Sequence, residues 1–495
     1  MKNPFVKAAL VVLVSVLPHL FGIRSSMLDY HHNRQINTAA IARNYHENGL
    51  RFLHPQIDWD GDNRGLAGTE FPLYMYLVGL FWGLGGLGDL WGRLLSIFFS
   101  AMTAVVLWRW LISWIGERPA FLAALLFPII PVEVYFGRTV QPEALALLCT
   151  VLSFWCLDLY LTRDSKAAWA GTWIFASLAI GHKLPYAYLL GVLGVLAYAR
   201  KDRASLRDPW LWTLPPLIAA SVFAWYKYVS YGVYVVPTSS SGILNQLQYS
   251  RILYYAKFQV LSRFPEITVT WAGMAFWATG AWCLWHHETK LRLMLWGYLA
   301  CVFAHSIIGG AYMFHHEYTA LPYAPVNAAF MGVGLDLLLD AVASFTERRR
   351  TLAAVGLAVL VTSFPVYTFF RIKHWYRVKD LFLLRAEAAA DAVSSRDDLF
   401  LCNEWASSTF PYYLHRRGWS VKMEGPDSKA KEWISDKMRL GGEFLMTRRS
   451  GVFEDPTSPL AKRVRECFPV AHSDPEFLIF RLSGDGVKPG CWERP

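Results

Sequence analysis

The polar stretch SSMLDYHHNRQINTAAIARNYHENGLRFLHPQIDWDGDNRGLAGTE, residues 25–70, separates one apolar segment from many others. The segment before it, KAALVVLVSVLPHLFGI (7–23), lacks a small-residue cleavage site, so we interpret it as a retained membrane anchor rather than a signal peptide. A turn between two membrane helices needs only a few residues. A polar loop of this length therefore predicts a functional site, and Asp29, just after the anchor, is its best catalytic candidate.

The composition predicts a polytopic membrane protein. Of the 495 residues, 54% are apolar and 17% are charged, and 22 are Trp, which exceeds ordinary globular usage in apolar and aromatic content. The net charge of +10 comes from short basic clusters between apolar runs, as the positive-inside rule expects of cytoplasmic loops, so it does not indicate nucleic-acid binding. The sequence contains no Cys-x-x-Cys motif and no Cys/His ligand spacing, so we do not expect a structural zinc site.

Eleven segments are apolar over about the 20 residues that a bilayer span needs. The run 71–87 is short and ends in Gly-rich sequence, so we expect an interfacial helix there instead of a twelfth span. This count places the most basic short loops, at 163–166, 200–207, 290–292 and 348–350, on the cytoplasmic side with the N-terminus. The predicted spans lie near 8–23, 91–114, 119–136, 143–162, 167–181, 184–199, 210–230, 267–286, 291–310, 319–342 and 352–371.

The sequence therefore divides into a transmembrane domain, residues 1–372, and a C-terminal domain, residues 373–495. Residues 24–90 of the first form the long outer loop with its interfacial helices. The second alternates β-rich runs with amphipathic helices, which predicts a small α/β domain on the outer face. Strands are expected at 398–403, 443–447 and 476–482, and helices at 409–418, 428–440 and 458–468. Whether two of Cys402, Cys467 and Cys491 form a disulfide stays open.

Two groups of charged residues on the outer side are candidate site residues. Asp29 is accompanied by His31, His32 and Arg34, and a carboxylate in a partly buried site can accept a proton from an attacking hydroxyl. The alternative is that Asp29 only caps a helix beginning near Arg34. In FGRTVQPEAL, Arg138 precedes Glu143, which also looks like an ordinary helix start after Pro142.

Two further groups follow. In AIGHKLPYAY, His182 and Lys183 lie in a short outer turn, where a lysine suits a phosphate, although it also suits lipid headgroups. In AYMFHHEYTALPYAP, His315, His316, Glu317 and Tyr318 suggest a metal or sugar site, but adjacent histidines point to opposite sides, and Tyr and His are ordinary residues at a membrane interface.

The segment DWDGDNRGLAGTE, residues 58–70, has acids at positions one, three and five of a calcium loop. Its sixth position is Asn63 instead of Gly, and its twelfth is Thr69 instead of an acid. A loop tied by side-chain hydrogen bonds is the better interpretation.

In this order the segments resemble the GT-C membrane glycosyltransferases that use polyprenyl-phosphate sugars, above all bacterial relatives of the protein O-mannosyltransferases and of the lipid A aminoarabinose transferase. The resemblance covers roughly residues 1–340. Two departures concern the donor and acceptor: Glu70 and Phe71 stand where the aminoarabinose transferases carry a lysine before paired prolines, and Glu143 stands where Asp is usual. The segments that carry it are TAAIARNYHENGLRFLHPQID, EFPLYMYL, GRLLSIFFSAMTAVVLW, GRTVQPEAL, GHKLP and HHEYTALPYAP.

The resemblance implies an integral protein of the bacterial inner (plasma) membrane that transfers a sugar, with inversion, from a polyprenyl-phosphate carrier to an acceptor on the periplasmic side. Asp29 is then the general base and Glu143 the second catalytic acid. Phosphate and donor binding fall to Arg34, Arg138, Lys183, His182 and Tyr318, and acceptor or loop support to Glu70, His32 and His316.

Several alternatives stay open. The acceptor is a glycan, lipid A or a protein, and the outer domain is a candidate module for recruiting it. A divalent cation near Asp29 and Glu143 is compatible with the sequence, although no ligand set is fixed. A different class, a transporter or flippase of lipid-linked sugars, predicts charges near mid-span, whereas most charges here lie at the outer edge.

Overall fold

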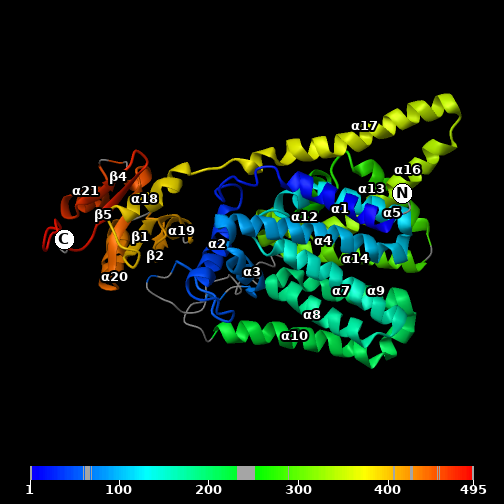
Figure 1. The fold of residues 1–495 in the computed structure, drawn as a ribbon, viewed down its shortest axis with the longest axis horizontal. Helices are drawn as coiled ribbons and strands as arrows, with labels where there is room; N and C mark the ends of the chain where they lie inside the picture. Colours follow the sequence, from blue (N-terminus) through cyan, green and yellow to red (C-terminus); the bar gives the residue numbers. More distant parts are fainter. Residues whose placement is uncertain are drawn as a thin grey trace.

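The computed structural model of the protein describes residues 3–59, 61, 67–68, 70–230, 251–287, 289–404, 407–423, 427–453, 455 and 457–492. Most positions that decide the calcium interpretation (Asp60, Asp62, Asn63 and Thr69) lie outside these residues. Helices run side by side along the long axis of the molecule, and the sheet lies beyond one end of them (Figure 1). The N-terminus is at the opposite end from the sheet.

The first half of the chain forms a helical bundle around the polar loop. The loop itself contributes α2 (His32–Glu47) and the short α3 (Leu73–Phe81), which pack on each other. At nine residues α3 is too short to cross a bilayer, as expected for the run 71–87. The other helices are α1 (Pro4–His19), α4 (Leu90–Ile115), α5 (Glu117–Leu126), α6 (Pro131–Phe136), α7 (Glu143–Arg163), α8 (Lys166–His182), α9 (Leu189–Lys201) and α10 (Pro209–Ser230).

The second half of the bundle repeats this pattern of long helices joined by short ones. Element η6 (Gln259–Thr268) and the turn η7 (Glu317–Ala320) carry polar residues between apolar helices. The helices are α12 (Ile252–Phe258), α13 (Met274–His286), α14 (Thr289–Ile308), α15 (Gly310–His315), α16 (Tyr323–Ser344) and α17 (Glu347–Ile372).

Five helices in the described part of the chain are long and apolar enough to cross a membrane: Leu90–Ile115, Glu143–Arg163, Thr289–Ile308, Tyr323–Ser344 and Glu347–Tyr376. The predicted span 119–136 is wrong as a continuous helix, because the chain breaks there into α5, a short 3-10 turn and α6. Pro128 and Pro131 cause the break, since proline removes a backbone donor and clashes with the preceding turn. The count of eleven spans stays a prediction.

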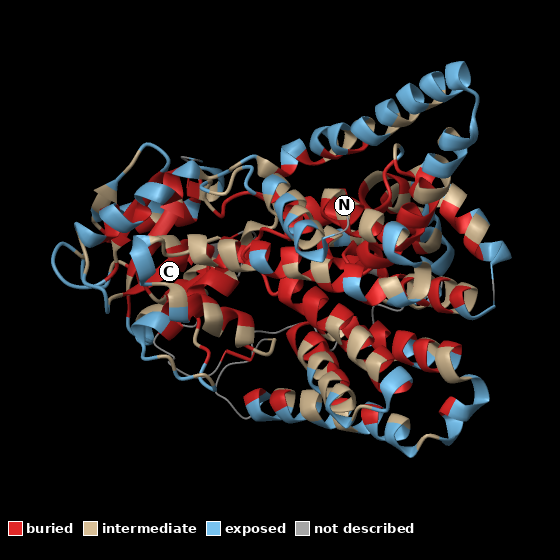
Figure 2. Ribbon diagram, turned by 45° about the vertical axis from the view of Figure 1, so that its right-hand side comes forward, coloured by how far each residue is buried: buried red, intermediate tan, exposed pale blue. Residues whose placement is uncertain are grey.

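Ion pairs group the chain turns at the end of the bundle opposite the sheet. Lys7 lies 2.8 Å from Glu117, and Arg118 lies 2.7 Å from Asp340, so the N-terminal helix, the α4–α5 turn and the end of α16 are neighbours. From this end α17 runs back to the sheet, apart from the other helices (Figure 1). Most of its surface is exposed (Figure 2), which is typical of an apolar helix that faces lipid.

The C-terminal part contains a five-stranded sheet in the order β2-β1-β3-β5-β4. Its strands are β1 (Leu399–Asn403), β2 (Gly418–Val421), β3 (Gly442–Arg448), β4 (Val470–Ser473) and β5 (Phe477–Arg481), and β1 runs parallel to both β2 and β3. All three predicted strands are present, and the predicted helices are present as α19 (Thr409–Leu414), α20 (Asp427–Arg439) and α21 (Pro459–Cys467). The prediction of helix over 409–418 is wrong in its last residues, because α19 ends at Leu414 and Gly418 begins β2. The domain boundary at residue 373 stays a prediction.

The central strands of the sheet are buried on both faces, whereas the edge strand β4 is partly exposed. Phe400 and Cys402 of β1 belong to the same apolar core as the helical bundle, whereas Leu399 and Leu401 pack in a separate core with α20 and α21. Cys467 and Cys491 form a disulfide with a Cα–Cα distance of 5.4 Å, and Cys402 is a buried free thiol.

Candidate functional site

The Asp29 carboxylate is fully enclosed by partners that hold it in place. Its Oδ2 accepts a hydrogen bond from Arg138 at 2.8 Å and lies 3.5 Å from a guanidinium nitrogen of Arg93. Its Oδ1 accepts a hydrogen bond from the amide of Gln35 at 2.6 Å. The side chains of Asp29 and Arg138 have no exposed surface. Two guanidinium groups therefore hold this carboxylate as a buried anion.

Asp29 does not cap a helix, so the alternative interpretation of this residue is wrong. Helix α2 begins at His32, after His31, whose φ of 57° turns the chain, and its first residues receive no side-chain cap. The turn is fixed by Tyr30, whose ring stacks on Trp375 at 5.3 Å and whose backbone N–H donates to the Trp375 carbonyl. This anchoring directs Asp29 into the interior.

A second cluster joins residues from four separate predicted segments. Arg34 on α2 donates to Glu70 Oε1 at 2.6 Å, and Lys183, at the end of α8, donates to the same oxygen at 3.0 Å. The Lys183 ammonium also lies 2.9 Å from Glu143 Oε1 at the start of α7. We call Arg34, Glu70, Glu143 and Lys183 the ionic cluster. It contains two cations and two anions within contact distance.

Glu143 is the least satisfied member of the ionic cluster. Its side chain is 1% exposed, and its contact with the Lys183 ammonium is an ion pair without a hydrogen bond. Among the described residues neither carboxylate oxygen has a hydrogen-bond partner. A buried carboxylate with unused acceptor capacity is costly, and such groups concentrate where a ligand or reaction uses them.

Aromatic and basic groups close the site on the other side. The Tyr318 ring centre lies 5.4 Å from the Lys183 ammonium, and its hydroxyl lies 3.1 Å from that of Tyr312. His31 contacts Glu317 at 2.9 Å. Arg263 on η6 lies 4.0 Å from Glu317 and donates to the Phe314 and His316 carbonyls, so it fixes this turn.

Electrostatics keep the site in a defined charge state. Burial alone raises the pKa of Glu70, but Lys183 and Arg34 outweigh it and hold that pKa well below its ordinary value. Burial, with the nearby basic side chains of His31, Arg34 and Lys183, lowers the pKa of His316 to about 3. At neutral pH Glu70 is therefore ionised and His316 is neutral.

Three of the candidate residues are bound elsewhere, although His182 directly precedes Lys183 of the ionic cluster. Arg138 forms a buried ion pair with Asp29, so its predicted role in phosphate binding would require this ion pair to break. His182 packs on Phe71 and binds the Leu178 carbonyl through Nδ1. His32 faces the sheet, near Asp380 and Glu404.

The sequence pattern does not single out four residues that the structure places at the site: Arg93, Gln35, Tyr312 and Arg263. A charged residue near the start of an apolar span, as Arg93 is in GRLLSIFF, was the available signal for the first of them.

The residues offer little to a divalent cation. Glu70 and Glu143 are both held by the Lys183 ammonium, which already supplies a positive charge between them. Among the described residues, no group of three or more His, Cys, Asp or Glu side chains is placed to hold a metal ion. We therefore derive no step through a metal.

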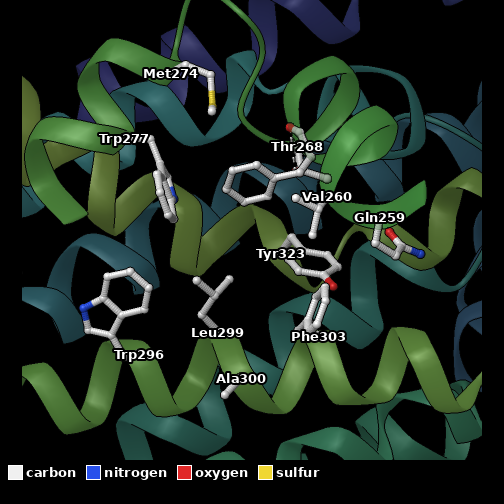
Figure 3. A pocket seen from close by; sticks show the side chains of 11 residues that line it. Gln259, Val260, Thr268, Met274, Trp277, Trp296, Leu299, Ala300, Phe303 and Tyr323 are labelled. Atoms are coloured by element: carbon white, nitrogen blue, oxygen red, sulfur yellow. Dashed lines mark hydrogen bonds between the residues drawn. The ribbon is translucent and has the colours of Figure 1, made fainter. Parts of the chain in front are cut away.

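An apolar cavity of about 470 Å³ lies among η6, α13, α14 and α16. Aromatic side chains, including Trp277, Phe303 and Tyr323, surround a common space (Figure 3). Element η6 also carries Arg263, so one element lines the cavity and contacts the turn that bears Tyr318. The full lining is Gln259, Val260, Phe264, Thr268, Met274, Trp277, Trp296, Leu299, Ala300, Phe303 and Tyr323.

Solved structures share this architecture over nearly the whole chain. ArnT from Cupriavidus metallidurans bound to undecaprenyl phosphate superposes with a TM-score of 0.65 at 14% identity, covering 98% of this chain and 99% of that one. The chain has the GT-C fold. The archaeal oligosaccharyltransferase AglB from Archaeoglobus fulgidus, in complex with an inhibitory peptide and a dolichol-phosphate, superposes with a TM-score of 0.64 at 11% identity, covering 99% and 74%.

Sequence comparison agrees over a shorter range. The family model of the dolichyl-phosphate-mannose-protein mannosyltransferases matches residues 69–226, which include Glu70, Arg138, Glu143 and Lys183. No curated protein sequence matches the chain. The expected resemblance to GT-C membrane glycosyltransferases is confirmed by this match and by the fold.

Proposed function

We propose that the protein is an inverting glycosyltransferase that moves a sugar from a polyprenyl-phosphate carrier to an acceptor at the periplasmic face of the bacterial inner membrane. The observation that carries this proposal is the ionic cluster. Arg34 and Lys183 converge on one carboxylate oxygen, which is the arrangement that an anionic phosphate oxygen also requires. The GT-C fold, and two structures of similar fold that hold undecaprenyl phosphate or dolichol-phosphate, support a donor of this class.

The apolar cavity provides the second requirement of a lipid donor. It is lined almost entirely by apolar and aromatic side chains, and η6 joins it to the polar turn near Lys183. In this proposal the isoprenoid tail enters the cavity while its phosphate lies against Lys183, Arg34 and Tyr318. Binding of the tail then positions the anomeric carbon at the ionic cluster.

The reaction needs one nucleophile and one leaving group. The acceptor oxygen or nitrogen attacks the anomeric carbon and gives its proton to a base, while the bond from that carbon to the phosphate oxygen breaks. The departing polyprenyl phosphate keeps the electron pair and gains negative charge, which Arg34 and Lys183 stabilise. Asp29 remains the proposed base. It is sealed in this structure, so its action requires the acceptor to reach a carboxylate that Arg138 and Gln35 now cover.

The test is a reconstituted assay with purified protein and radiolabelled polyprenyl-phosphate sugars, in which the release of free polyprenyl phosphate is measured. Lys183→Met removes the charge and keeps the length of the side chain. We expect release to fall by about 10²-fold or more, the usual size of a lost transition-state charge contact. Release by no donor from a folded protein would refute this function, and equal release by Lys183→Met would refute the role of Lys183 in it.

A further inference from the structure

A crevice outside the proposed reaction site lies at the carboxyl end of β3, between residues 448–450, the residues that precede β5 and the strip 378–382. The carboxyl end of β1 adjoins it, because Glu404, which follows β1, accepts a hydrogen bond from Arg448, the last residue of β3. Strand β1 has β2 on one side and β3 on the other, so the strand order reverses beside the crevice, and open sheets with parallel strands place ligands near such points.

A dense set of polar groups fills this edge. Arg448 donates to Glu404 Oε2 at 2.6 and 2.9 Å and to Asp380 Oδ1 at 2.6 Å. These three side chains are each partly exposed, between 15% and 29%. Beside them lies a cavity of about 460 Å³, lined by Val378, Asp380, Leu381, Phe382, Arg448, Arg449, Ser450, Pro475 and Glu476.

The crevice adjoins the segment that carries Asp29. The backbone N–H of Lys379 donates to the Leu28 carbonyl at 3.0 Å, so the strip 378–382 lies directly on the start of the polar loop. His32, three residues after Asp29, lies close to Asp380 and Glu404. Burial lowers the pKa of His32 more than these acids raise it, which leaves a neutral ring between the crevice and α2.

We propose that this crevice binds a neutral sugar unit of the acceptor. Its lining carries two acidic and two basic side chains, and the two basic ones, Arg448 and Arg449, donate to different oxygens instead of converging on one as Arg34 and Lys183 do, so they do not form a phosphate site. Carboxylates accept and guanidinium groups donate, which matches hydroxyls that do both, and the exposed faces of Leu381 and Pro475 suit the apolar face of a sugar ring. This inference rests on the proposed transferase function, because it assigns that enzyme a carbohydrate acceptor.

The test measures sugar binding without any donor. The full-length protein in lipid nanodiscs is titrated with the methyl glycosides of glucose, galactose, mannose and N-acetylglucosamine, and binding is detected by saturation-transfer NMR. Ser450→Trp places a large side chain in the cavity from an exposed position, and Ser483→Trp is a matched exposed control beyond β5, at the opposite end of the sheet. Equal thermal unfolding of both variants shows that both are folded.

We expect at least one glycoside to bind the wild type and Ser483→Trp, and its signal to fall at least fivefold in Ser450→Trp. No binding by the wild type, equal binding by Ser450→Trp, or displacement of the sugar by inorganic phosphate would each overturn the proposal. Because no donor is present, a negative result leaves the donor-cleavage assay standing. Failure of donor cleavage likewise leaves this titration interpretable.

Discussion

The substitution Asp29→Asn affects two roles of one carboxylate, the counter-charge that the structure shows and the base that we propose. As the proposed base, Asp29 would contribute on the order of 10²–10⁴-fold to turnover. As a counter-charge, it neutralises Arg138 and Arg93, whose guanidinium groups lie 2.8 and 3.5 Å from its Oδ2 in a fully buried site. Removing one partner of a buried ion pair typically costs about 3–5 kcal/mol in the free energy of unfolding. We therefore expect the single variant to lose both turnover and stability.

The double variant Asp29→Asn with Arg138→Gln distinguishes these roles. Gln removes the charge that Asn leaves unpaired, so we expect a large part of the lost unfolding free energy to return, with Arg93 accounting for the remainder. Residues in direct contact are coupled in this way. Turnover is expected to stay at least 10²-fold below wild type, since no base has been restored.

Thermal unfolding and the release of free polyprenyl phosphate are measured on the same preparations. Arg138→Gln alone is the control: it keeps the carboxylate and removes one of its partners, so its turnover should exceed that of Asp29→Asn. The reasoning is refuted if turnover returns together with stability in the double variant. Asp29 would then act only as the counter-charge that orders Arg138, and the base would be another group.

Two further predictions follow from the ionic cluster and the apolar cavity. Because the folded-state pKa of Glu70 is lowered, its contribution to stability is present above its ordinary pKa of about 4.3 and is lost as the pH falls below that value. Glu70→Gln should therefore flatten the fall of the unfolding temperature below about pH 4.3, and an unchanged pH profile would argue against the pairing with Arg34 and Lys183. Ala300→Trp fills the cavity and should raise the KM for a full-length polyprenyl donor several-fold, but leave a donor with a two-isoprene chain unaffected; equal effects on both donors would place the tail elsewhere.

Hydropathy predicts the long helices of this fold well, because lipid exposure demands a continuous apolar run. It fails where proline interrupts such a run, as Pro128 and Pro131 do between α5 and α6. It also misses β2 and β4, which are four residues each and too short to show a strand period. The register of β2 depends on Gly418, where a side chain would collide with the Phe400 carbonyl. No local sequence pattern predicts this contact between Gly418 and Phe400, which are 18 residues apart in the chain.

Charged residues at the outer edge of the spans indicate which side chains belong to the ionic cluster. They do not indicate which cation pairs with which anion. Arg34, Glu143 and Lys183 were singled out because ionisable groups at that depth are costly, and the structure brings them together with Glu70. Which cation takes which anion depends on packing across distant segments. Arg138 was expected at the phosphate but is buried against Asp29.

The pairing within the ionic cluster bears on how a donor would be held. A buried Lys183 and a partly buried Arg34 would be costly without partners, so Glu70 and Glu143 keep both cations charged and positioned before any phosphate arrives. A phosphate oxygen that binds both cations must share them with Glu70 Oε1 or replace it, since that atom already contacts both. The ionic cluster has no net charge, because its two cations are balanced by its two anions. Stabilisation of the departing polyprenyl phosphate therefore depends on where the two cations lie. Glu70 would act as a placeholder whose displacement accompanies donor binding.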